Sequence, residues 1–140
     1  MINDTDAPLE NDIIVPHFDD EKDEMLKIQL QRIEDVPGCL VLYLSGIIDG
    51  YNVNYFRKRV DKAIEAGFIR LIFDLSGLNY VDFLLESLTA FLKAVKPQGG
   101  DLVLVEMPPK ICGVLQLLGF FQFSTFKENL SEAVSFFAAR

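Results

Sequence analysis

The chain lacks most of the residues from which enzymes build hydrolytic or metal sites. It contains one histidine, His17, and two cysteines, Cys39 and Cys112, without a CxxC pair. Catalytic devices of the Ser-His-Asp or Cys-His type, and metal sites of the His/Cys type, need histidine at the site. Because His17 lies in an acidic N-terminal stretch, we expect no enzyme activity, no metal and no other cofactor. We expect both cysteines to be reduced and buried.

Nucleotide-binding loops and membrane-crossing segments are also missing. Neither GxxxxGK[ST] nor GxGxxG occurs in the chain, and no apolar run approaches the roughly 18 residues that cross a bilayer. The first residues, MINDTD, have neither the cationic start nor the apolar middle of a signal peptide. These absences predict a cytoplasmic protein that does not act at a membrane.

Negative charge is concentrated at the N-terminus. Residues 1–25 contain nine acidic residues and one lysine, which account for the whole net charge of −8. Such a segment cannot bury enough apolar surface to fold alone, so we predict a disordered acidic tail at 1–24 and a folded domain at 25–140. The apolar triplet Ile13-Ile14-Val15 either pairs with a sheet edge or remains a lone cluster in the tail.

The hydrophobic pattern of the remaining chain predicts one small α/β domain. Strands of period two or of continuous apolar character alternate with helices of period 3.6, which favours right-handed crossovers and a parallel sheet. We therefore expect a mixed, mainly parallel sheet of four to five strands with about four helices. In chain order the predicted elements are strands at 26–31 and 40–44 forming a hairpin, a helix at 53–64, a strand at 68–73, a helix at 82–95, a strand at 102–105, a short helix at 109–118, an edge strand at 121–126 and a helix at 128–137.

The segment 71–87, LIFDLSGLNYVDFLLES, joins a buried strand to a helix. Asp74 ends the strand, Ser76-Gly77 predicts a turn, and Asp82 is an N-cap residue type before a helical apolar run. With Asp49, these aspartates lie at or beyond the predicted carboxyl ends of strands, where α/β sheets bind ligands. A carboxylate Mg²⁺ site is one interpretation. The other is that Asp74 caps a turn and Asp82 caps the helix.

A basic face on the first predicted helix has two interpretations. Arg57-Lys58-Arg59 and Lys62 form either a solvated helix face or a docking surface, for an acidic partner or for the chain's own acidic tail. Nucleic acid is not the expected partner, because no aromatic platform accompanies these cations.

Several motifs, taken in order, resemble those of the STAS domain family, which includes bacterial anti-sigma factor antagonists and sulfate-transporter C-terminal domains. Gly46-Ile47-Ile48-Asp49 is similar to the family's Gly-x-hydrophobic-Asp. Residues 71–78 resemble its apolar-Asp-Leu-Ser segment, and Val81-Asp82 its helix-opening aspartate. The resemblance covers roughly residues 26–137, and its later matches are Gly99-Gly100, the strand to Val105, residues 109–120 and residues 130–134.

The resemblance implies a regulatory protein-binding module. Its docking surface would comprise Asp49 and the helix start formed by Asp82, Phe83, Leu84, Glu86 and Ser87. In the family's antagonists this helix opens as Asp-Ser-[Ser/Thr]-Gly, and an anti-sigma factor kinase phosphorylates the second hydroxyl. The unphosphorylated form binds that kinase and frees sigma. The implied partner is a serine kinase-type anti-sigma factor or another STAS-pathway protein; the alternative is a phosphorylation-independent scaffold or homodimer subunit.

The chain departs from that pattern at the residues that carry the switch. Phe83-Leu84-Leu85 occupy the three positions, so the usual acceptor position holds Leu84, which cannot be phosphorylated. Ser87 is the nearest hydroxyl, and is either a substitute acceptor or a solvated helix serine. Phosphorylation at the usual position is therefore not expected.

Phe83 has two interpretations of its own. At about 100° per residue it lies about 140° from the centre of the helix's apolar stripe, on a side shared by Ser87, Ala90 and Ala94. It is either an exposed partner anchor beside small residues, or it folds back under the loop around Asn79-Tyr80.

Overall fold

A mixed sheet forms the centre of the fold. The structure, a computed structural model, describes residues 11–112 and 125–140. Within these residues the five strands lie in the order β2 (Leu26–Arg32), β3 (Cys39–Ile48), β4 (Arg70–Val81), β5 (Asp101–Val105) and β6 (Thr125–Phe126). β2 and β3 pair antiparallel, and all other neighbours pair parallel. The predicted α/β architecture is confirmed.

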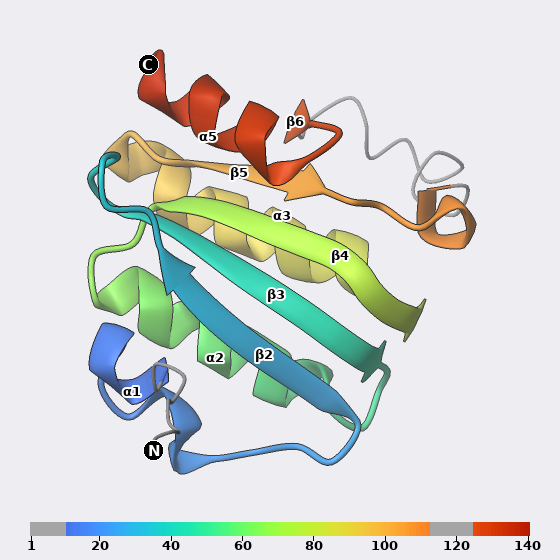
Figure 1. The fold of residues 1–140 in the computed structure, drawn as a ribbon. Helices are drawn as coiled ribbons and strands as arrows, with labels where there is room; N and C mark the ends of the chain where they lie inside the picture. The colour runs from blue at the N-terminus through green and yellow to red at the C-terminus, as the bar shows by residue number, and fades with distance from the viewer. Residues whose placement is uncertain (1–10, 113–124) are drawn as a thin grey trace, which may run out of the picture.

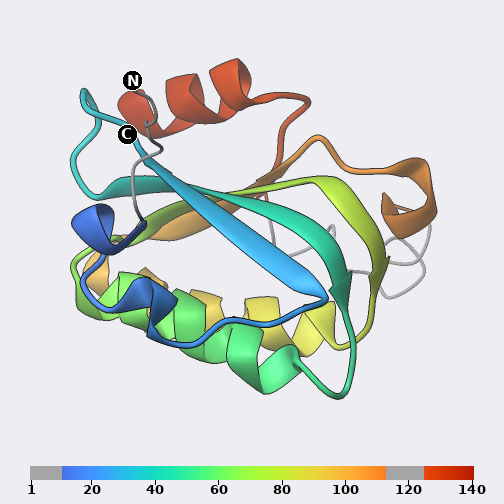
Figure 2. The same ribbon diagram turned by 60° about the horizontal axis from the view of Figure 1, so that its bottom comes forward.

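Helices cover both faces of this sheet. α2 (Val53–Glu65) and α3 (Leu84–Val95) pack on one face, and α5 (Leu130–Ala138) lies on the other (Figures 1 and 2). Under α2 and α3, three phenylalanine rings from three elements form the centre of the main core, with centroids 5.6–6.3 Å apart: Phe56, Phe73 and Phe91. β5 is buried along its whole length, because helices cover both of its faces.

β4 is longer than the sequence pattern predicts. The expected turn at Ser76-Gly77 is wrong: the strand continues to Val81 through an irregularity in its pairing with β3. Asp74 folds its side chain back along this irregularity, where its Oδ1 accepts hydrogen bonds from the Ser76 amide (2.9 Å) and hydroxyl (2.7 Å). A Cβ at Gly77 would lie 2.8 Å from the Leu44 carbonyl oxygen, so the close strand approach requires glycine.

Residues 11–24 fold against the rest of the domain, so the prediction of a disordered tail is wrong for these residues. A helical turn, α1 (Asn11–Ile14), and a 3-10 turn, η1 (Phe18–Asp20), pack beside β2 and α2. We call residues 11–20 the strap. Val15 and Phe18 of the strap are completely buried in the main core, and these two apolar side chains explain why an acidic segment folds onto the domain.

The basic face of α2 does not point uniformly to solvent. Arg59 is buried, and its guanidinium donates a hydrogen bond to the carbonyl oxygen of Phe18. The sequence left open a solvated face or a docking surface for the acidic tail. Arg59 does contact the N-terminal segment, but it binds a backbone carbonyl there and not an acidic side chain.

A carboxylate anchors the C-terminal end of the chain. Asp101 is buried and pairs with Arg140 (2.8 Å) and Lys96 (3.1 Å). Burial alone would raise the pKa of Asp101. The hydrogen bonds from Arg140, the Leu102 amide and Lys96 outweigh it and hold that pKa below its usual value. The interaction joins Arg140, two residues after the end of α5, to the start of β5.

The remaining expectations concern the cysteines and the chain around the undescribed gap. Cys39 is buried, which raises its pKa to about 11, whereas Cys112 is only half-buried. The short helix expected at 109–118 is present at 109–112, and its remainder lies outside the described residues. Of the strand expected at 121–126, the structure describes only β6.

Candidate functional site

Two neighbouring parallel strands bring the predicted site residues together. Ile47 and Ile48 at the end of β3 lie opposite Tyr80 and Val81 at the end of β4. The Asp82 amide then donates to the Ile48 carbonyl (2.8 Å), which extends the pairing by one residue. The loop after β3 and the start of α3 are therefore adjacent, as a docking surface built from both requires.

Asp49 shapes the loop between β3 and α2. Its Oδ1 accepts hydrogen bonds from the amides of Tyr51 (2.9 Å) and Asn52 (3.2 Å), and Asn52 Oδ1 accepts one from the Asp49 amide (2.8 Å). These reciprocal bonds fix the loop in one conformation. Tyr51, at its tip, is 100% exposed.

Asn52 is a positioning residue that the sequence argument missed. Its side chain is buried, and its Nδ2 donates to the Ile47 carbonyl (3.0 Å) and to Asp23 Oδ2 (2.9 Å). It therefore joins the Asp49 loop to β3 and to the segment before β2. An asparagine three residues after an aspartate in a predicted loop is the available sequence signal, but its contact with Asp23 depends on the tertiary fold.

Asp82 does not cap α3 as predicted. The helix begins at Leu84, and its N-cap is Phe83, which makes no side-chain capping hydrogen bond. Asp82 Oδ2 instead accepts a hydrogen bond from the Tyr80 hydroxyl (2.6 Å), and this bond raises the pKa of Tyr80. The strand extension to Val81 moves the helix start past Asp82, so the aspartate cannot reach the first helical amides.

Phe83 adopts a left-handed backbone conformation, with φ 63° and ψ 19°. A bulky residue seldom occupies this region, because its Cβ crowds the backbone. Its ring is 48% exposed, and a Cβ placed on Gly50 would lie 3.7 Å from Phe83 Cε2. The side chain therefore lies half-exposed beside the loop after β3.

The other predicted residues of the helix start separate into buried and exposed positions. Leu84 is a core residue, and Glu86 is exposed. Ser87 is completely buried, and its hydroxyl has no hydrogen-bond partner. The prediction that Ser87 shares an exposed surface with Phe83 is wrong. It lies at the border of the buried stripe and is small enough to be covered.

We call the group formed by the partly buried Asp49 and the exposed Tyr51, Tyr80, Asp82 and Phe83 the junction surface. Three of its members are aromatic side chains at least 48% exposed. None of the ion pairs in the described residues includes its carboxylates or Glu86. Large exposed aromatic side chains beside carboxylates that lack an ionic partner in the described residues are suited to a partner with an apolar pocket and cationic side chains.

The three aspartates considered for Mg²⁺ do not meet. Asp74 lies within β4 and bonds to Ser76, whereas Asp49 and Asp82 lie beyond the strand ends. In residues 11–112 and 125–140, no group of three or more His, Cys, Asp or Glu side chains is placed to hold a metal ion. In the same residues no helix has both the length and the apolar character needed to cross a membrane.

Comparisons with known proteins agree with the fold. The model of the STAS domain family matches residues 27–133. BtrV of Bordetella bronchiseptica, provisionally named an anti-sigma factor antagonist, is 25% identical over 96 residues, which are 68% of this chain and 80% of BtrV.

Solved structures of similar fold include two proteins with related descriptions. A Thermotoga maritima protein, provisionally described as an anti-sigma factor antagonist, has a TM-score of 0.73 at 22% identity, covering 79% of this chain and 94% of that one. The anti-sigma factor antagonist SpoIIAA of Bacillus, in its unphosphorylated form, has a TM-score of 0.69 at 19% identity, covering 81% and 98%.

Proposed function

We propose that this chain, which belongs to the STAS domain family, acts as an anti-sigma factor antagonist-like regulator that binds its partner through the junction surface. The observation that carries the proposal is the exposed Phe83 in its left-handed conformation. Strained residues persist where the surrounding structure holds them in place, and they are concentrated at functional sites. An aromatic ring held in this way is pre-organised for a partner pocket.

The charge of the junction surface supports a particular partner chemistry. Asp49 and Asp82 are carboxylates without a basic partner among the ion pairs of the described residues, and Glu86 is exposed nearby on α3. A partner with lysine or arginine around an apolar pocket would complement this surface. A serine kinase-type anti-sigma factor, or another STAS-pathway regulator, is the proposed class.

We further propose that this binding is not switched by phosphorylation at the usual position. SpoIIAA has been solved in both phosphorylated and unphosphorylated forms. Here Leu84 occupies the acceptor position and is part of the core. Ser87 is 0% exposed, so a kinase could reach its hydroxyl only after local opening of α3. Both residues favour a module that remains competent to bind.

The direct test is titration calorimetry of the full chain against each kinase-type anti-sigma factor encoded beside it in its source genome. We expect Phe83→Ala to weaken binding at least about tenfold, as for a buried aromatic hot spot. Ile13→Ala, which removes another exposed apolar side chain on a different element, should leave affinity unchanged. Equal affinities for the wild type and Phe83→Ala would contradict the proposed surface.

Phosphorylation is tested separately, by incubating the chain with that kinase and ATP and then measuring intact mass. We expect no added phosphate at residues 82–87. Phosphate mapped to Ser87 would show a substitute switch and would contradict constitutive binding.

The exposed Phe83 also supports a second candidate function, a homodimer subunit or scaffold. A two-fold contact through the junction surface would bring Asp49, Asp82 and their copies together, and like charges disfavour that contact. Self-association of the wild type that Phe83→Ala abolishes, without binding to any anti-sigma factor, would favour this alternative.

A further inference from the structure

The outer edge of β2 has no strand partner in the described part of the chain. β2 is seven residues long, and its other edge pairs along its whole length with β3. The carbonyl of Ile28 and the amide of Leu30 are among the groups that point away from β3. A strand edge of this length that is not paired with another strand is a template on which one can pair.

One side chain of the strap makes the hydrogen bonds that a neighbouring strand would make. Asn11 Nδ2 donates to the Ile28 carbonyl (2.7 Å), and the Leu30 amide donates to Asn11 Oδ1 (2.9 Å). The Gln29 side-chain amide donates to the same Oδ1 (3.2 Å). Asn11 is buried, so these bonds are shielded from water. Its amide thus satisfies one outward carbonyl and one outward amide of β2, two groups that a neighbouring strand would otherwise bind.

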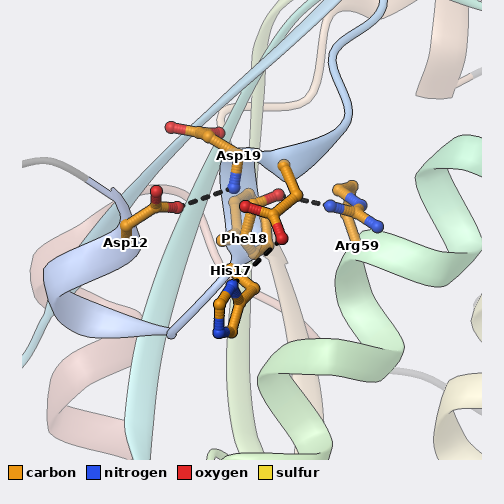
Figure 3. A network of polar contacts seen from close by, with 6 residues as sticks. Asp12, His17, Phe18, Asp19 and Arg59 are labelled. Atoms are coloured by element: carbon orange, nitrogen blue, oxygen red, sulfur yellow. Dashed lines mark hydrogen bonds and ion pairs between the residues drawn. The ribbon is translucent and has the colours of Figure 1, made fainter.

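The rest of the strap keeps Asn11 in place. Figure 3 shows Arg59 reaching from α2 to the Phe18 carbonyl, and Asp12 Oδ1 accepting a hydrogen bond from the Asp19 amide (2.7 Å). The Arg59 guanidinium also lies over the rings of Phe18 (5.9 Å) and Tyr55 (5.6 Å). The strap is therefore anchored to α2 at one end, and it covers the β2 edge at the other.

We propose that the outer edge of β2 is a strand-docking surface, that the strap occupies it in cis, and that a second copy of this chain pairs with it when the strap is displaced. A two-fold axis through Gln29 places Ile28 of one copy opposite Leu30 of the other. Asn11 now satisfies the carbonyl of Ile28 and the amide of Leu30. In the dimer, the Leu30 amide of each copy donates instead to the Ile28 carbonyl of the other copy.

The side chains of β2 are self-complementary in this register. On the solvent side, Lys27 lies opposite Gln31 of the second copy, and the Gln29 amides face one another, so no like charges meet. On the core side, Leu26, Ile28 and Leu30 extend the apolar face of the sheet across the axis. These features favour a second copy over a partner of different sequence.

The test uses the full chain and Asn11→Ala, which removes the substitute hydrogen bonds. Ile13→Ala, in the same helical turn but 70% exposed, is the matched control. We expect the Leu30 amide of Asn11→Ala to exchange hydrogen at least about tenfold faster at low protein concentration, because its acceptor is lost. As concentration rises, sedimentation should show a dimer that wild type and Ile13→Ala do not form, and Leu30 should regain protection.

A second substitution identifies the surface that pairs. Adding Gln31→Lys to Asn11→Ala places a lysine opposite Lys27 of the other copy on both sides of the axis, and should weaken the dimer at least about tenfold. Three results would overturn the proposal: unchanged exchange at Leu30, faster exchange without dimerisation, or a dimer that Gln31→Lys does not weaken. None of them depends on anti-sigma factor binding.

Discussion

The strap and the start of α3 differ in how composition relates to burial. The strap lies in the acidic N-terminal segment and has three aspartates without a lysine or arginine, yet it contributes Val15 and Phe18 to the core, and its Asn11 amide is buried with hydrogen bonds to β2. The start of α3 reads Phe83-Leu84-Leu85, yet Phe83 is half-exposed and the helix has no side-chain N-cap. Average polarity predicts the wrong environment at both places.

The two regions differ in the interactions that fix their conformation. In the strap, two apolar side chains and a few well-placed polar groups offset the cost of ordering an otherwise solvated segment. At the start of α3, the length of β4 fixes where the helix begins, and Phe83 must take the left-handed conformation that joins them. Local order therefore depends on individual contacts in the first region and on backbone geometry in the second.

The largest expected effect tests whether the strap belongs to the folded core. Phe18→Ala removes a completely buried ring and its contact with Arg59, and should lower the free energy of unfolding by about 3 kcal/mol. Ile13→Ala, on an exposed strap residue, should change it by less than about 0.5 kcal/mol. Urea unfolding measures both. If Phe18→Ala changed the free energy of unfolding as little as Ile13→Ala, the burial of Phe18 would contribute nothing to stability. The contrast between the strap and α3 would then be lost.

The sequence predicts the sheet well, because alternation and continuous apolar runs report burial directly. The pattern of Leu26, Ile28 and Leu30 is the burial pattern of β2. The same reasoning fails at Asn11, whose burial depends on a strand edge 17 residues away in the chain. It also fails at Asp82, because only the tertiary pairing with β3 keeps the chain extended past Ser76-Gly77.

The proximity of the candidate site residues was predictable from the sequence, whereas the exposure of each side chain was not. Asp49 and Asp82 follow adjacent parallel strands, and the order of elements is sufficient to place them together. The exposure of Phe83 and the burial of Ser87 depend on the residue at which α3 begins. The start of the helix decides in which direction the side chains of its first turn point. No local signal in the sequence marks that start.

An intermediate effect tests the backbone conformation at the start of α3. Alanine and glycine at position 83 both remove the ring, but only alanine retains a Cβ at positive φ. Phe83→Gly should therefore be more stable than Phe83→Ala by about 1 kcal/mol. At Lys93, an exposed position within α3, the order should reverse, with glycine about 1 kcal/mol less stable than alanine. Urea unfolding of the four variants gives both differences. The same sign at both positions would mean that Phe83 is not left-handed in solution.

The smallest expected effect concerns the hydrogen bond from Tyr80 to Asp82, which is exposed to solvent. This bond and the negative charge of Asp82 raise the pKa of Tyr80, so Asp82→Asn should lower that pKa toward the ordinary tyrosine value. Because the folded-state pKa is the higher one, the bond's contribution to stability is present below the unfolded-state pKa and is lost as pH rises through the folded-state value. Tyrosinate absorbance during alkaline titration measures the shift, and Tyr80→Phe identifies the signal. An unchanged Tyr80 titration in Asp82→Asn would mean that the hydrogen bond between Tyr80 and Asp82 does not form in solution.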